Sequence, residues 1–132
     1  MAIIRWDPFN EFWAGRDSVL TRNRWAPPVD IYETDDAVVI KAELPDMKRE
    51  DIDVVVENGT LTLSGERKLD EQIDEDSFHR IERRYGAFSR SFTLPDRVDA
   101  DRVSAEYHNG VLIIRLPLRP ESRPRQIQVE AA

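Results

Sequence analysis

The feature that most constrains this chain is the series of short, alternating β-branched runs that fills residues 25–118. Apolar and polar residues alternate there with a period of two, and Asp, Asn, Gly or Pro breaks the pattern roughly every ten residues. No helical period is sustained across this range. Many short strands in one domain predict an all-β fold, and we expect an immunoglobulin-like β-sandwich.

Two Asn-Gly pairs, Asn58-Gly59 and Asn109-Gly110, mark the tightest turns of this domain. Each pair lies between two apolar runs, and both of its residues tolerate the positive φ that a two-residue hairpin turn requires. We therefore expect two β-hairpins. The other expected elements are strands at 37–44 and 87–94 and a short helical turn within 46–51.

Three segments do not fit the core of a sandwich. Residues 1–24 are rich in aromatic side chains, residues 66–84 are a long, charge-dense connection, and residues 117–126 are rich in Pro and Arg and are expected to be extended. We divide the chain into an N-terminal arm (1–24), a domain (25–118) and a C-terminal extension (119–132).

Composition limits the compartment and the partners. The formal net charge is −7, and because residues 1–24 and 119–132 each sum to +1, the domain carries −9. An acidic domain repels phosphate backbones, so we expect no nucleic-acid partner. The chain has no cysteine, which favours a cytoplasmic location, and no apolar run is long enough for a membrane span.

No catalytic, metal or cofactor pattern stands out. The acidic run 70–76 lacks the glycine turn and ligand spacing of a calcium loop and is expected to be a solvated charged stretch. His79 and His108 stand apart from other ligand residues, and the five glycines are isolated. We expect no enzyme, no metal ion and no cofactor, although scattered carboxylates leave a glycoside or ester hydrolase open.

A set of motifs gives the chain a family resemblance. The motifs are Trp6-Asp7-Pro8-Phe9, Pro28-Val29-Asp30-Ile31-Tyr32-Glu33, Glu43-Leu44-Pro45-Asp46, Gly59-x-Leu61-x-Leu63-x-Gly65-Glu66, Tyr85-Gly86-x-Phe88-x-Arg90-x-Phe92-x-Leu94-Pro95, Ala105-x-x-x-x-Gly110-Val111-Leu112 and Ile127-Gln128-Val129. In this order they resemble the motifs of the small heat-shock proteins, the Hsp20/α-crystallin family, in its bacterial and plant type. Asp46 stands where the family usually has Gly, and Asp can occupy such a turn.

The resemblance implies an α-crystallin domain of seven or eight strands with a flexible arm, which dimerises by exchanging a strand of the long connection. The candidate strand, 78–82, would pair near residues 29–32 of the partner. Reciprocal exchange would also cover two exposed strand edges under a two-fold axis. The expected dimer-interface residues are Ile31, Phe78, Ile81 and Arg90.

Arg90 alternates with apolar residues on its strand, so its side chain is expected on the apolar face. A structural role is favoured over a catalytic one, because a buried guanidinium must find carboxylates or carbonyls. We interpret it as half of an ion pair at the dimer interface, with an acidic partner that the sequence does not identify.

The extension ends in Ile127 and Val129, which lie on one face of an extended segment. This pair could form an edge strand of its own domain, but three prolines separate it from the last core strand and favour docking on a neighbour. The family resemblance implies a groove between two strand edges, here 52–56 and 103–107. Its expected lining is Val54, Val56, Val103 and Ala105.

The aromatic arm is the expected client-binding segment. Its aromatic residues could instead form a buried helix, but the polar residues among them favour an adaptable apolar surface. The client-binding candidates are Trp6, Phe9, Phe12 and Trp13.

The leading functional hypothesis is an ATP-independent holdase chaperone. It would bind partly unfolded proteins under heat or other stress, prevent their aggregation as a homo-oligomer, and pass them to ATP-dependent chaperones. The second hypothesis is a monomeric sandwich adaptor or co-chaperone that binds one folded partner. The two differ in oligomeric state, which a sizing column measures.

Overall fold

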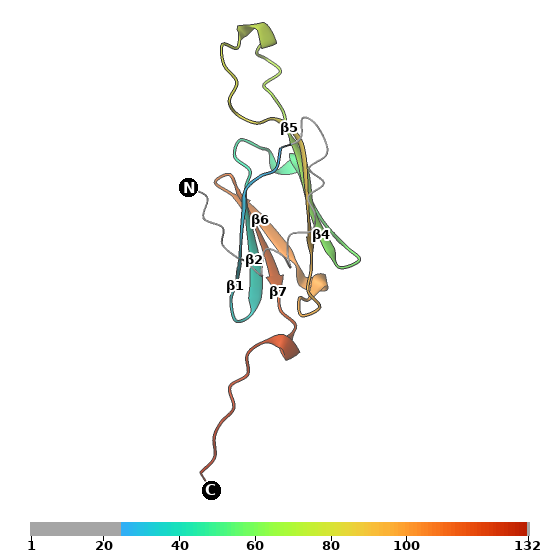
Figure 1. The fold of residues 1–132 in the computed structure, drawn as a ribbon, viewed down its shortest axis with the longest axis vertical. Coiled ribbons are helices and arrows are strands. Elements are labelled where there is room, and N and C mark those ends of the chain that lie inside the picture. The colour runs from blue at the N-terminus through green and yellow to red at the C-terminus, as the bar shows by residue number, and fades with distance from the viewer. Residues whose placement is uncertain (1–24, 132) are drawn as a thin grey trace, which may run out of the picture.

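The computed structural model describes residues 25–131, which form two antiparallel β-sheets packed face to face (Figure 1). The four-stranded sheet has the order β1 (Val29–Glu33), β2 (Ala37–Glu43), β7 (Val111–Pro117) and β6 (Ser104–His108). The three-stranded sheet has the order β3 (Ile52–Glu57), β4 (Thr60–Arg67) and β5 (Gly86–Thr93). The predicted all-β sandwich is confirmed.

Short 3₁₀ turns lie between the strands and after the last one. Between strands they are η1 (Arg49–Asp51), η2 (Glu75–Ser77) and η3 (Ala100–Arg102), and η4 (Pro120–Ser122) follows β7. The helical turn expected within 46–51 is therefore present as η1.

The apolar core lies between the two sheets. Inward positions of β4 and β5 alternate along each strand, so that Leu61, Leu63, Phe88 and Phe92 are buried. They pack in one cluster with buried side chains of the other sheet, such as Ile114. Removing this alternating set from water is the main contribution to the stability of the sandwich.

The predicted turns have the expected backbone geometry. Asn58 and Gly59 have φ of 52° and 72°, and Asn109 and Gly110 have φ of 53° and 76°. Asp46 has φ of 58°, so this residue does adopt the left-handed conformation that a glycine would favour. Both hairpins and the turn at Asp46 are confirmed.

Two segment boundaries differ from expectation. β4 runs on to Arg67, because Glu66 and Arg67 still pair with Ala87 and Gly86, and the long connection therefore spans residues 68–85. The Pro/Arg-rich segment is not extended throughout. Its residues 120–122 form η4, since proline at the first position of a helical turn is already set to the required φ.

The long connection and the C-terminal extension project from opposite ends of the sandwich (Figure 1). The connection leaves where β4 ends and β5 begins, and the extension leaves after β7. Contacts made through these two segments therefore lie far apart on one subunit.

Candidate functional site

The two sheets end in open edges at β3 and β6, each of which pairs with a strand on one side only. On β3, Val54 lies opposite Leu63 and Val56 lies opposite Leu61. Both leucines are fully buried, so Val54 and Val56 share their inward face, yet both remain half-buried. No strand of the described chain pairs with this edge of β3.

The β6 edge repeats this pattern. Ala105 lies opposite Ile114 and Tyr107 lies opposite Leu112, so both point to the inward face. Tyr107 and Val103 are half-buried against the core, whereas Ala105 is exposed although it faces inward. An inward-facing position that stays open to solvent is a place where another apolar side chain can pack.

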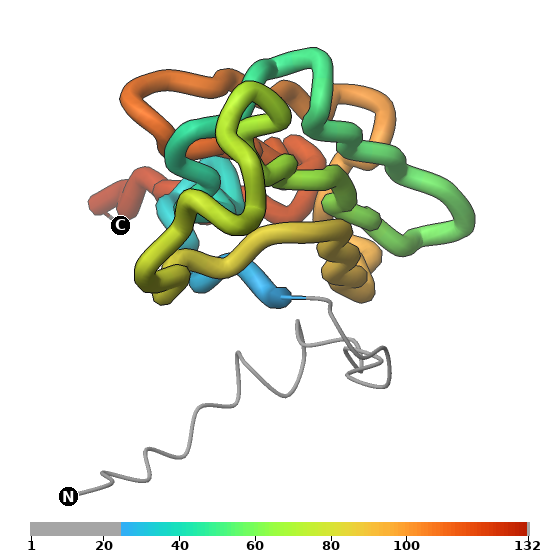
Figure 2. The backbone as a smooth tube through the Cα atoms, turned by 90° about the horizontal axis from the view of Figure 1, so that it is seen from above, coloured from blue at the N-terminus to red at the C-terminus, as the bar shows by residue number. Residues whose placement is uncertain are grey.

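The two open edges lie on the same side of the sandwich. The segment that leads into β1 packs on β5, with the rings of Trp25 and Phe88 5.0 Å apart and a 3.0 Å hydrogen bond from Trp25 Nε1 to the carbonyl of Gly86. Figure 2 shows this segment, in blue, beside the gold β5. In the packed sheets, edge strand β5 therefore lies over the edge that β1 forms. The opposite edges, β3 in one sheet and β6 in the other, then lie together on the other side of the sandwich. Three of the four predicted lining residues thus lie on two strands on one side, and the fourth, Val103, directly precedes β6.

The extension presents its apolar pair to solvent. Ile127 is 77% exposed and Val129 is 90% exposed, and residues 123–131 belong to no strand of the described chain. The start of the extension is held in place: Arg119 Nε donates to the carbonyl of Asp96 at 2.8 Å, and Arg123 Nε donates to that of Leu118 at 3.1 Å. Only the stretch beyond these anchors is left to reach a neighbour.

The predicted dimer segments are β1 and the long connection. β1 pairs only with β2, and Ile31 on it is half-buried against the core. Phe78 is half-buried and Ile81 is 52% exposed, and residues 78–82 form no strand within this subunit. The subunit therefore holds both an open edge and an unpaired apolar segment. Exchange between them stays a prediction.

Arg90 lies on the inward face of β5, opposite Leu63. Its side chain is half-buried, donates from Nη1 to the carbonyl of Pro27 at 3.2 Å, and lies 5.2 Å from the ring centroid of Phe92. The inward position is as expected. The ion pair across a dimer stays a prediction.

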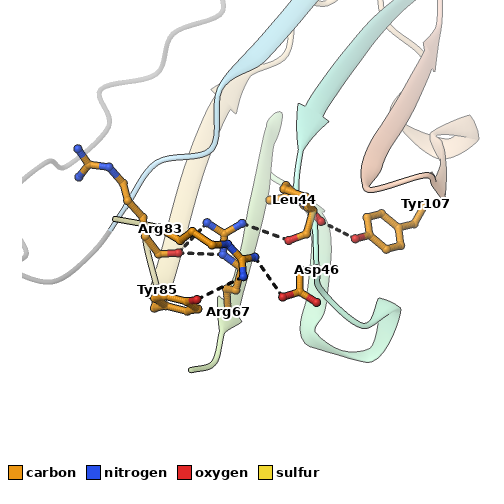
Figure 3. Close-up of polar contacts among 8 residues, drawn as sticks. Leu44, Asp46, Arg67, Arg83, Tyr85 and Tyr107 are labelled. Carbon is orange, nitrogen blue, oxygen red and sulfur yellow. Dashed lines mark hydrogen bonds and ion pairs between the residues drawn. The ribbon is translucent and has the colours of Figure 1, made fainter. Parts of the chain in front are cut away.

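Arg67 is a buried residue that joins several segments of the chain, and it was not predicted from the sequence. It is 7% exposed and is the one buried charged side chain in the described part of the chain. Its guanidinium lies 4.1 Å from the ring centroid of Trp25 and donates to the carbonyls of Arg84, at 2.8 and 2.6 Å, and Pro45, at 3.1 Å (Figure 3). Burial lowers the pKa of Arg67, and the nearby charge of Arg83 lowers it further.

A second layer of contacts surrounds this arginine. Arg83 donates to the carboxylate of Asp46 at 3.0 Å, and this hydrogen bond raises the pKa of Arg83. The hydroxyl of Tyr107 donates to the carbonyl of Leu44 (Figure 3). The turn at residues 44–46 therefore contacts both Arg67 and the β6 edge. The sequence did contain a signal for the inward position of Arg67. Leu61, Leu63, Gly65 and Arg67 occupy alternate positions, so an extended strand places all four on the same face.

The client-binding candidates Trp6, Phe9, Phe12 and Trp13 lie outside the described residues. Over residues 25–131, no group of three or more His, Cys, Asp or Glu side chains is placed to hold a metal ion. No helix in the same range is long and apolar enough to cross a membrane.

Comparison with known proteins points to one family. The family model described as Hsp20/alpha crystallin family matches residues 30–130. The chain is 38% identical over 138 residues to the spore protein SP21 of Stigmatella aurantiaca, covering 98% of this chain and 78% of that protein. It is 40% identical over 132 residues to the 17.8 kDa class I heat shock protein of Arabidopsis thaliana, covering 96% and 81%.

Solved structures agree with the sequence matches. The fold is similar to that of a small heat-shock protein from Xylella fastidiosa, with a TM-score of 0.71 and 44% identity over 82% of this chain and 99% of that one. It is also similar to hspA from Xanthomonas axonopodis, with a TM-score of 0.67 and 46% identity over 74% and 97%.

Proposed function

Because this chain belongs to the Hsp20/alpha crystallin family of chaperones, we propose that it is an ATP-independent holdase that binds partly unfolded proteins and keeps them from aggregating. The observation that carries the proposal is the pairing of unoccupied apolar edges with an exposed apolar tail. Val54, Val56, Val103 and Ala105 line edges that residues 25–131 leave open, and Ile127 and Val129 of the same range are exposed to solvent. Such a subunit is suited to bind other extended chains.

The first such chain is the tail of a neighbouring subunit. Ile127 and Val129 would insert between β3 and β6 of that neighbour. Side chains two residues apart in an extended segment lie on the same face, so both would point into the groove. Each contact is weak alone, but a subunit that both offers a tail and accepts one gains from several contacts at once. Assembly by this route is reversible, which a holdase needs in order to expose apolar surface on demand.

The second contact is a strand-exchanged dimer. The segment 78–82 of one subunit would pair with the open edge of β1 in the other, so that Phe78, Ile81 and Ile31 become covered and Arg90 lies close to the interface. The open edge of β1 would otherwise favour uncontrolled association. Reciprocal exchange covers the β1 edge of both subunits in a closed pair.

Client binding is proposed for the arm. Trp6, Phe9, Phe12 and Trp13 supply aromatic surface, which binds unfolded chains by apolar burial without a fixed sequence. The domain carries a net charge of −9 and would keep the loaded complex in solution. No step in this scheme uses nucleotide, and release of the client would pass to ATP-dependent chaperones.

The test is suppression of aggregation of insulin reduced with dithiothreitol, followed by light scattering without nucleotide. We expect suppression by the full chain and weaker suppression by a variant that lacks residues 1–24, because the sandwich would remain folded while the aromatic surface is lost. An inert protein of equal net charge is the control. A requirement for ATP, or suppression no stronger than the control, would refute the holdase.

Equal suppression without the arm would instead move client binding onto the sandwich edges. A full chain that stays monomeric at all concentrations and fails to suppress aggregation would favour the adaptor hypothesis.

A further inference from the structure

We propose that Arg67 is a positioning residue for assembly: its guanidinium fixes where the N-terminal arm and the long connection leave the sandwich, and so presets the strand exchange. The inference rests on the strand-exchanged dimer of the proposed function. It adds a residue that lies outside the segments expected to pair.

Arg67 joins three parts of the chain that are far apart in sequence. It stacks on Trp25, the first described residue after the arm, and its Nε and Nη2 both donate to the carbonyl of Arg84, near the end of the long connection. Its Nη1 donates to the carbonyl of Pro45 in the turn after β2. Figure 3 shows the guanidinium between the two carbonyls to which it donates.

A sandwich core does not need this charge. Arg67 continues the inward row of Leu61 and Leu63, where an apolar side chain would bury at lower cost. Its hydrogen bonds in the described chain all go to backbone carbonyls, so no carboxylate bonds directly to the buried charge. What the guanidinium provides beyond a leucine is direction, because its donors form a rigid, planar fork.

On its return path, the long connection is tied to the sandwich at this point. Within residues 25–131, the hydrogen bonds of residues 70–82 join them only to one another, through short turns and the ion pair between Arg80 and Glu82. The first ties to the sandwich on the return path are Arg83 to Asp46 and the carbonyl of Arg84 to Arg67. The exchange segment 78–82 ends only two residues before Arg84. These two ties therefore restrict the direction in which the segment leaves the sandwich.

A fixed exit lowers the entropy that dimer formation must remove. A loop held in its bound direction binds more tightly than one that samples many directions, with no new contact at the interface. Lysine at position 67 keeps the charge and the apolar stem, but it lacks the planar fork and cannot hold the carbonyl of Arg84 with two donors while stacking on Trp25.

The experiment is a dilution series of the full chain followed by native mass spectrometry, which reads the concentration at which monomer appears. We compare wild type, Arg67→Lys, the exposed replacement Arg49→Lys, and Ile40→Val as a core variant of lowered melting temperature. The midpoint is the protein concentration at which half of the subunits are monomeric. Arg67→Lys should raise this midpoint at least tenfold and speed hydrogen exchange of amides 78–86. Arg49→Lys and Ile40→Val should do neither. Trp25→Phe, which removes the hydrogen bond to Gly86 and reduces stacking, should shift the midpoint in the same direction by less.

Equal midpoints for Arg67→Lys and Ile40→Val at matched loss of melting temperature would overturn the inference, since Arg67 would then act only through global stability. Trp25→Phe decides the matter if Arg67→Lys fails to fold: an unchanged midpoint overturns the inference. A wild type that is monomeric throughout would overturn the exchanged dimer itself. That failure is recognised because it occurs without any substitution.

Discussion

Replacing both Ile127 and Val129 with alanine should reduce larger assemblies to dimers. The two side chains are 77% and 90% exposed in the isolated subunit, so docking between β3 and β6 of a neighbour can bury most of their area. Full burial of such a side chain is worth about 1.5–3 kcal/mol, which these fractions scale to about 2.5–5 kcal/mol per tail. Alanine keeps a minor part of that area, so the expected loss is about 2–4 kcal/mol per tail.

A loss of this size weakens each tail contact roughly 30-fold to 1,000-fold. The sandwich should be unaffected, because residues 123–131 belong to no strand of the described chain and both side chains are exposed. The assay is size exclusion coupled to light scattering at equal protein concentration, with circular dichroism to check the β content. The matched control replaces both Gln126 and Gln128 with alanine, because these residues lie on the opposite face of the same extended segment.

Two outcomes are required if Ile127 and Val129 dock by apolar burial. The alanine pair at 127 and 129 must lower the mass distribution, and the pair at 126 and 128 must leave it near that of wild type. An unchanged mass for the first pair would show that the tail is idle in assembly. Equal loss in both pairs would contradict docking through one apolar face of the tail.

Two further substitutions test the contacts at the edges of the sandwich. Ala105→Glu places a carboxylate in the open inward position of β6, so it should reduce the mass of the assemblies. The melting temperature should change little, because Ala105 is already exposed. An unchanged mass by light scattering would show that β6 is not part of the docking surface. Arg90→Ala should lower the free energy of unfolding by about 1.5–3 kcal/mol through loss of its charged hydrogen bond to the carbonyl of Pro27. The exposed Arg102→Ala should stay within about 0.5 kcal/mol of wild type, and equal shifts for the two in urea unfolding would contradict a structural role for Arg90.

Much of the fold was predictable because its signals are local. The Asn-Gly pairs fix positive φ by the identity of the residues themselves, and alternation along β3, β4 and β5 assigns each side chain to one face whatever the partner strand is. The placement of Arg90 on the inward face followed from the same period. The boundary between β4 and the long connection was wrong by two residues, because the charged side chains of Glu66 and Arg67 resemble a loop in sequence while their backbone pairs with β5.

By itself, then, the sequence determined the strands, the turns, the family and the apolar pair of the tail, since each depends on residues close together in the chain or on motifs in order. Only the tertiary structure decided that Ala105 faces inward yet stays open, because that depends on which strands end each sheet. It also decided the burial of Arg67. A charge can be buried only where partners converge on it, and here they are the ring of Trp25 and the carbonyls of Pro45 and Arg84, which no local pattern brings together.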